Sequence, residues 1–350
     1  MNTPKFKSSS FLKNKYIFIL LSILLLLTFI FNISLGSVSI PFNEIINTLT
    51  GGRASKSTWT FIILDYRLPK ALTASIAGGG LALSGLLMQT LFRNPLAGPF
   101  VLGLTSGASL GVAMLILGAG IIGGFTGGLL LNPWSITIAS ALGSFLVVLA
   151  VLAVTLKIKD TMAILIIGLM FGTLTGSIVS ILAYYSNAEQ LQQFVYWSYG
   201  SLGNVSWTGI AILSVCFTIG ILLSILVIKS LNALLLGENY AKSMGVGVKK
   251  TTFIIIIATS ILAGGITAFV GPIAFIGLAV PHLSRQLFNT ANHFTLIPAT
   301  VLLGSILVLI CDIIAQVPFT EHTLPINAVT AFIGAPVVIW LLIRKRKLVF

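Results

Sequence analysis

Apolar residues run along this chain in stretches of about twenty, separated by short polar connections. A helix of about 20 apolar residues crosses the ~30 Å hydrocarbon core of a bilayer, whereas membrane β-strands alternate apolar and polar residues. The stretches do not alternate, so the pattern predicts an all-α fold with about ten transmembrane helices. We expect these helices near residues 17–36, 63–91, 97–118, 135–156, 161–185, 209–228, 252–270, 272–284, 296–316 and 325–343.

Two of the expected spans have unusual lengths. Span 63–91 is longer than a perpendicular crossing needs, so it must tilt or project from the membrane. Segment 272–284 is too short to cross alone, and Gly271–Pro272 and Val280–Pro281 lie at membrane depth, so we expect a half-helix there. Because Pro interrupts the helical hydrogen-bond ladder, and broken helices in membranes line cavities or protein interfaces, we expect this break to line one or the other.

The composition supports the membrane assignment. The 350 residues are 57% hydrophobic and only 8% charged, with a mean hydropathy of +1.08. A soluble domain carries about a quarter charged residues, so this chain could not cover a surface that faces water. No hydrophilic stretch is long enough for a separate domain. Residues 1–350 are therefore predicted to form a single transmembrane domain of a polytopic membrane protein.

The basic residues indicate an orientation. With ten crossings, the outer side receives only Arg53, Lys56, Arg67 and Lys70, and the other side receives the rest. Basic residues favour the cytoplasmic side, so we expect both termini, the tail 1–16 and the segment 229–251 in the cytoplasm, and the protein in the cell membrane. The basic residues behind the net charge of +13 are then expected to set the orientation of the protein in the membrane and to contact anionic lipid, rather than nucleic acid. A cleaved signal peptide is the alternative for the first span, but no A-x-A cleavage site follows it. The inner basic residues are Lys5, Lys7, Lys13, Lys15, Arg93, Lys157, Lys159, Lys229, Lys242, Lys249, Lys250, Arg285, Arg344, Lys345, Arg346 and Lys347.

The sequence lacks the motifs of common catalytic and metal sites. There is no GxxxxGK[ST] phosphate loop and no HExxH motif, and the three histidines fall in different connections. Cys216 and Cys311 lie alone inside expected spans, as small core residues do. We therefore expect a protein that is not an enzyme by itself and holds neither a cofactor nor a metal.

One polar stretch, "LNALLLGENYAKSMGVGVKK" at 231–250, interrupts the apolar chain. Glu238 and Ala241 stand one helical turn apart, and Gly245 can adopt positive φ and end a helix sharply. A short helix stopped by a glycine predicts a compact knob for a cytosolic partner. The alternative is a solvated connection with ordinary capping.

Four segments resemble the permease subunits of the ABC importers for iron–siderophore complexes, haem and vitamin B12. The likeness runs from about residue 35 to the C-terminus in the same order, and "RNPLAGP" is a specific motif. The resemblance implies the fold of the vitamin B12 importer permease, a type II importer. The segments are "RLPKALTASIAGGGLALSGLLMQTLFRNPLAGPFVLGLTSGASLG" (67–111), "LNALLLGENYAKSMGV" (231–246), "GPIAFIGLAVPHLSR" (271–285) and "LPINAVTAFIGAPVVIWLL" (324–342).

The resemblance also implies partners. These are a second permease (a homodimer is expected), two cytosolic ATPase subunits that bind ATP and Mg, and an extracytoplasmic binding protein. The knob would be the coupling helix inserted into an ATPase cleft, driving alternating access. There Glu238 would cap or pair at the contact, Ala241 would allow close approach and Gly245 would make the turn. The implied coupling residues are Leu236, Gly237, Glu238, Ala241, Met244 and Gly245.

Two further sites follow from the resemblance. The cytoplasmic gate would combine Asn94, Pro95 and Leu96 with Thr161 and Met162, although Met162 replaces a small polar residue. For the N-P-L segment a plain helix stop with an N-cap is the alternative.

Docking of the binding protein would use Arg67 and Lys70. Lysine lacks the bidentate fork of the family's arginine, and Gln316 stands where a third family arginine is expected. Snorkelling of Arg67 and Lys70 to the membrane interface is the alternative.

Asp312 is the one acid well inside a hydrophobic run, and it could brace its helix or take part in transport. "PHLSR", with His282 and Arg285, is expected to mark the inner end of the eighth helix. An ion-coupled secondary transporter would need more intramembrane charges, and a membrane-embedded enzyme would need converging polar side chains. The near absence of buried charge suits instead a wide path for a bulky chelate, with an iron–siderophore complex expected before vitamin B12 or haem.

Overall fold

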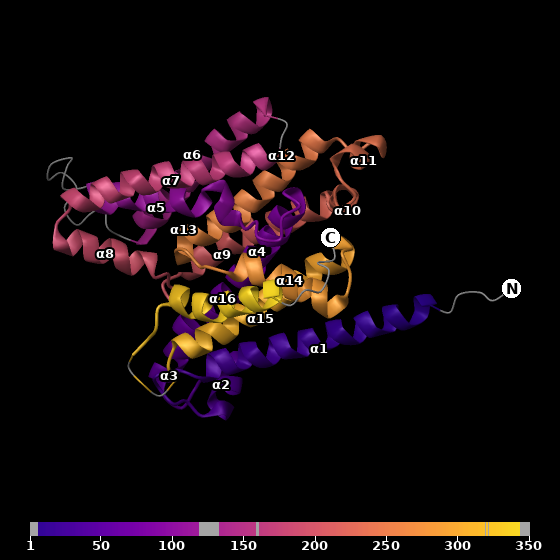
Figure 1. The fold of residues 1–350 in the computed structure, drawn as a ribbon. Helices are drawn as coiled ribbons and strands as arrows, with labels where there is room; N and C mark the ends of the chain where they lie inside the picture. The colour runs from indigo at the N-terminus through magenta and orange to yellow at the C-terminus, as the bar shows by residue number, and fades with distance from the viewer. Residues whose placement is uncertain (1–5, 119–132, 159–160, 319, 321, 344–350) are drawn as a thin grey trace.

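The computed structural model describes residues 6–118, 133–158, 161–318, 320 and 322–343, and their regular elements are helices (Figure 1). The first half contains α1 (Phe6–Ser34), α2 (Phe42–Leu49), α3 (Ser57–Phe61), the π-helical turn η1 (Ile62–Arg67), α4 (Leu68–Leu91), the 3₁₀ turn η2 (Pro99–Leu102), α5 (Leu104–Ile116), α6 (Pro133–Lys157) and α7 (Thr161–Tyr185). The second half contains α8 (Ala188–Ser198), α9 (Trp207–Leu226), α10 (Ile228–Leu234), α11 (Glu238–Ser243), α12 (Val248–Thr259), the π-helical turn η4 (Ser260–Gly264), α13 (Gly265–Val270), α14 (Ile276–Phe288), α15 (His293–Ala315) and α16 (Ile326–Ile343).

Each of the ten predicted spans coincides with a helix. Among the described residues, seven helices are long and apolar enough to cross a bilayer, and the shorter α5, α14 and α16 account for the other three spans. The predicted starts of two spans are wrong. Residues 97–103 form a loop and η2 before α5, and residues 271–275 form a break before α14. Gly103 and Gly271 take positive φ in these two places, at +71° and +75°.

The helix α4 is the central element of the bundle. It continues α3 and η1 without interruption, so that residues Ser57–Leu91 form one 35-residue helix, as the overlong second span predicted. Against α4 pack α15, α14, α12 and α9. Glycines allow the close approach, because a Cβ on Gly78 would lie 2.2 Å from Gly304 O and one on Gly85 only 1.8 Å from Gly277 O. Such contacts between small residues hold helices together in lipid, where the hydrophobic effect cannot.

Two groups of helices flank this centre. On one side α5 packs against α6 and α7, with Gly107 and Gly143 at the contact between α5 and α6. On the other side α1 packs mainly against α15, and Figure 1 shows it along one edge of the bundle.

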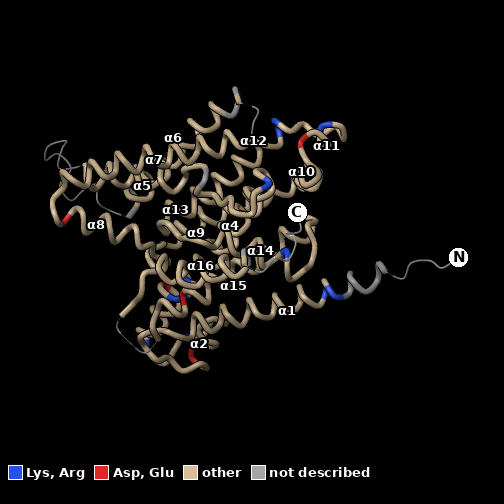
Figure 2. The backbone as a smooth tube through the Cα atoms, in the orientation of Figure 1, with Lys and Arg blue, Asp and Glu red and all other residues tan. Residues whose placement is uncertain are grey.

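The bundle has two ends of different character. α10, α11 and the start of α1 lie toward one end, and α2, α3 and α8 lie toward the other (Figure 1). We call these the α11 end and the α8 end. Charged residues gather at the ends, with long uncharged stretches between them (Figure 2). Residues 6–16, which were predicted to belong to the cytoplasmic tail, form the start of α1. Four predicted features lie outside the described residues: residues 1–5, Lys159, the basic run 344–347 and most of the glycine-rich stretch 118–128.

Candidate functional site

The polar stretch 231–246 folds into a projecting corner at the α11 end. Gly237 (φ +106°, ψ 154°) reverses the chain between α10 and α11, a conformation that is essentially restricted to glycine. Gly245 (φ +80°) ends α11, where its N–H donates to Lys242 O and the N–H of Val246 donates to Ala241 O, each at 3.0 Å. This pair of bonds is a Schellman motif. The predicted helix stop at Gly245 is therefore confirmed.

The two faces of α11 differ. Leu236, Tyr240 and Met244 are spaced by four residues and are 62%, 53% and 59% exposed. They form an apolar ridge on the outside of the corner, which we call the α11 ridge. Ala241 is fully buried beneath it. The small side chain of Ala241 thus lets α11 pack against its own chain. Its role in the close approach of a partner stays a prediction that this burial does not favour.

Glu238 lies in the first turn of α11, where a negative charge suits the helix dipole. Its carboxylate is 3.5 Å from the Lys242 ammonium, four residues later in the same short helix. Exposed pairs of this kind contribute little to stability. Within the chain Glu238 thus pairs with Lys242, and its predicted capping or pairing at a contact with the ATPase stays a prediction.

The N-P-L segment follows directly from the end of α4. Arg93 takes positive φ (+46°), and the Asn94 N–H donates to Gln89 O at 3.1 Å, which closes the helix. The side-chain oxygen of Asn94 then accepts from the N–H of Leu96 at 2.9 Å. A Cβ on Gly237 would lie 3.4 Å from Nη1 of Arg93, so this turn lies beside the α11 corner. The segment is thus a helix stop, and the side chain of Arg93 at its start reaches the α11 corner.

The 3₁₀ turn that follows one half of the predicted gate touches the helix that carries the other half. η2, which comes just after the N-P-L turn, packs against α7, the helix that carries Met162. A Cβ on Gly103 would lie 3.2 Å from Gly168 O of α7. Leu96 is 45% exposed and Met162 is 53% exposed, whereas the side chain of Thr161 lies outside the described part of the structure. Their role as a gate stays a prediction.

Arg67, predicted to dock a binding protein, is held inside the chain. Its side chain is buried, and its guanidinium donates to Ile33 O and Ser34 O at 2.9 Å and to Val38 O. These carbonyls end α1 and begin the following loop. Arg67 therefore ties the end of α1 to the start of α4.

Lys70 is also engaged within the bundle, at Asp312. The Lys70 ammonium lies 3.1 Å from Oδ1 of Asp312, and the two side chains are 12% and 3% exposed. Oδ2 of Asp312 accepts from Asn32 and from Gln316, each at 2.8 Å. We call this group the Asp312 clamp, because it joins α1, α4 and α15. The prediction that Asp312 braces its helix is confirmed, and docking through Arg67 and Lys70 stays a prediction that their burial does not favour.

A further charge is buried near the α11 end. Arg285 of α14 is 6% exposed, and its Nη1 donates to Oε1 of Gln89 on α4 at 2.6 Å. Gln89 in turn donates to Leu278 O at 3.2 Å. The expected near absence of buried charge is therefore wrong, since Arg67, Arg285 and Asp312 are buried with polar partners. The polar contacts that Asn32, Gln89 and Thr90 form inside the bundle were not predicted from the sequence. The one feature of the sequence that could have indicated them is that each is a polar residue within an apolar span.

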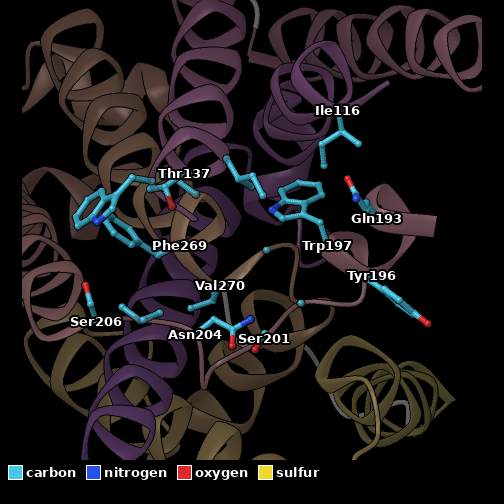
Figure 3. A pocket seen from close by; sticks show the side chains of 16 residues that line it. Ile116, Thr137, Gln193, Tyr196, Trp197, Ser201, Asn204, Ser206, Phe269 and Val270 are labelled. Atoms are coloured by element: carbon cyan, nitrogen blue, oxygen red, sulfur yellow. The ribbon is translucent and has the colours of Figure 1, made fainter. Parts of the chain in front are cut away.

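A cavity of about 510 Å³ opens at the α8 end. Trp197, Phe269 and Thr137 converge on it from α8, α13 and α6 (Figure 3). Trp134 packs edge-on against Phe269, and Gln193 and Asn204 add amides to the lining, which has no charged residue among those that the structure describes. Gly271 lines the cavity too. Of the two predicted environments for the break after α13, a cavity or a protein interface, the structure thus shows a cavity at Gly271.

A bundle of spanning helices, with a broken helix beside a cavity and a polar corner at the opposite end, defines a multi-pass membrane transport protein. The chain belongs to the FecCD transport family, whose profile matches residues 24–344. It is therefore a permease subunit of an ABC importer, a non-catalytic component that is expected to hold no cofactor and that implies ATPase and binding-protein partners.

Two relatives and one solved structure illustrate the likeness. The hemin transport system permease protein of Yersinia pestis is 34% identical over 328 residues, which cover 93% of this chain and 95% of that protein. The vitamin B12 import system permease protein of Klebsiella pneumoniae is 33% identical over 332 residues, 93% of each chain. A solved inward-facing metal-chelate type ABC transporter superposes with a TM-score of 0.79 at 30% identity, covering 94% of this chain and 99% of that chain. The predicted fold of a vitamin B12 importer permease is confirmed.

Proposed function

We propose that the chain forms the translocation path for an iron–siderophore or related metal-chelate complex, as one of two identical permeases in an ATP-driven importer. The name of the solved transporter supports a metal-chelate cargo. The names of the two relatives support the alternatives, haem and vitamin B12. The uncharged cavity with aromatic rings and amides also suits a bulky complex that is held by shape. Uptake of a labelled ferric siderophore, haemin or cobalamin by proteoliposomes separates these cargoes.

The α11 ridge is the observation that carries the coupling proposal. Exposed apolar patches on water-facing segments mark sites of protein interaction. Leu236, Tyr240 and Met244 form such a patch on a corner that Gly237 and Gly245 hold in place. We infer that the α11 end faces the cytoplasm, with both termini, and that the ridge enters a cleft of a cytosolic ATPase that binds ATP and Mg.

The gate follows from the neighbourhood of this corner. Arg93 and Gly237 are adjacent, so a movement of α11 displaces the turn that carries Asn94, Pro95 and Leu96. The helix α7, which begins with Thr161 and Met162, packs against η2, the element that follows this turn. We infer that these two segments close the inner mouth of the path between ATP-driven cycles.

On the outer side, a carboxylate-bearing binding protein needs exposed cations. Arg53 and Lys56 are exposed at the α8 end, on the loop between α2 and α3. The Lys56 ammonium lies 4.8 Å above the ring of Trp59, and this contact leaves it at the surface. We infer that Arg53 and Lys56 contribute to docking in addition to, or in place of, Arg67 and Lys70.

Replacing Tyr240 with Asp tests the coupling proposal. A charge in the middle of the α11 ridge is expected to weaken co-purification with the ATPase at least tenfold, because central aromatic residues of an interface each contribute about 2 kcal/mol or more. Tyr184→Asp is the matched control, since Tyr184 is 83% exposed at the end of α7, near α8. Equal retention of the ATPase by both variants would contradict the proposal.

A further inference from the structure

A buried histidine joins the stem of the α11 corner to the end of α4. His293, the first residue of α15, is fully buried. Its Nδ1 lies 2.8 Å from Oδ1 of Asn232 on α10, and its Nε2 lies 2.8 Å from Oγ1 of Thr90 on α4. Asn232 stands just before α11, and Thr90 stands just before the N-P-L turn. The three side chains therefore form a direct path between the two segments.

The surrounding bonds determine which nitrogen of His293 carries the hydrogen. Oδ1 of Asn232 also accepts from the backbone N–H of His293 at 2.9 Å, so this atom is the amide oxygen. The amide nitrogen donates to Oδ1 of Asn292, an oxygen that accepts from the N–H of Phe294. In the neutral imidazole Nδ1 must therefore donate to Asn232, which leaves Nε2 as an acceptor. The hydroxyl of Thr90 is the donor to Nε2.

The donor of this last hydrogen bond has a second acceptor within its own helix. The hydroxyl of Thr90 is also 3.0 Å from Leu86 O, one turn back in α4. Its single hydrogen can serve either His293 or Leu86, so the Thr90 donor stays paired when the end of α4 moves away from α15, while Nε2 of His293 loses its donor. The neighbouring Gln89 has a firmer partner in the buried guanidinium of Arg285, because a charged hydrogen bond is stronger and its loss leaves a charge poorly solvated.

We propose that His293 is a positioning residue that couples the α11 corner to the N-P-L turn through a releasable hydrogen bond with Thr90. This inference rests on the proposed coupling function. When a partner displaces α11, α10 moves with Asn232 and His293, and the end of α4 follows as long as Thr90 donates to His293. When the Thr90 hydroxyl rotates and donates to Leu86 O instead, the end of α4 no longer follows His293, and the N-P-L turn takes a second position. Arg285 keeps α4 attached to α14 in both positions.

Thr90→Val removes the hydroxyl and keeps the shape. Thr73→Val is the matched control, because Thr73 is equally buried on α4 and also donates to the carbonyl four residues back, Pro69 O at 2.8 Å. The measurement is cargo transported per ATP hydrolysed, in proteoliposomes that contain the permease with its ATPase and binding protein. We expect this ratio to fall at least threefold in Thr90→Val while ATP hydrolysis stays within twofold. Thr90→Ser and Thr73→Val are expected to keep the wild-type ratio.

A second variant protects the test against misfolding. His293→Asn keeps a donor near Asn232 and loses the acceptor for Thr90, so it is expected to lower the ratio as Thr90→Val does. A wild-type ratio in both variants, or an equal fall in Thr73→Val, would overturn the role of His293. Absence of ATP-dependent uptake by the wild-type assembly would instead refute the proposed function itself.

Discussion

Lys70 and Asp312 bring opposite charges into the interior of the bundle, where each charge stabilises the other. Removing two ions from water costs several kcal/mol per ion, and this cost is offset only when the geometry is good and the remaining polar atoms have partners. Asn32 and Gln316 provide such partners for the carboxylate. At the scale of single residues, the Asp312 clamp is therefore a structural device that fixes α1 and α15 to α4.

We predict that Lys70→Met destabilises the protein by about 3 kcal/mol, because it leaves the Asp312 carboxylate buried without a cation. The double variant Lys70→Met/Asp312→Leu should recover most of this loss, since an apolar pair needs no solvation. Thermal unfolding in detergent measures both effects. If the losses of Lys70→Met and Asp312→Leu simply add in the double variant, the two residues do not interact as described.

Single residues were predictable from the sequence only where their partners are local. The turn at Gly245 follows from a short helix and one glycine, and the structure has it. Arg67 and Lys70 were assigned outward because a sequence displays charges but not the distant carbonyls and carboxylate that bind them. Asn232, Thr90 and His293 come from three separate segments, so nothing in the chain indicated their contact.

At the scale of elements, glycines decide how closely the helices pack. Gly85 of α4 faces the backbone of Gly277 at the start of α14, directly after the break at 271–275. The ten spans could be predicted because an uninterrupted apolar stretch of about twenty residues is a strong indication of a transmembrane helix. The starts of α5 and α14 could not, because apolar loops and breaks have the same composition as the helices that follow them.

We predict that Gly85→Ala destabilises the bundle by about 1–3 kcal/mol or more, as overpacking does, because the added methyl would meet Gly277 O. Gly265→Ala is the matched control, since its Cβ would lie 3.5 Å from Cys216, an ordinary contact. There alanine should be neutral or stabilise the helix by up to about 1 kcal/mol. Equal unfolding temperatures for the two variants would show that the contact of α4 with α14 is looser than described.

At the scale of the whole molecule, the bundle separates an uncharged cavity at one end from a polar corner with an apolar ridge at the other. A permease of an ABC importer needs both ends, because cargo arrives on one side of the membrane and the ATPase acts on the other. The distribution of basic residues predicts which of these ends faces the cytoplasm, the α11 end. The His293 path adds a route by which the corner can act on the N-P-L turn within one chain.

Labelling of single cysteines in intact cells tests the central claim, which is that the α11 corner faces the cytosol. Asn239 and Glu189 are exposed at opposite ends, and each is replaced by cysteine in a chain with Cys216→Ser and Cys311→Ser. A membrane-impermeant maleimide should modify Glu189→Cys in intact cells and Asn239→Cys only after the membrane is opened. Modification of Asn239→Cys in sealed cells would contradict the account.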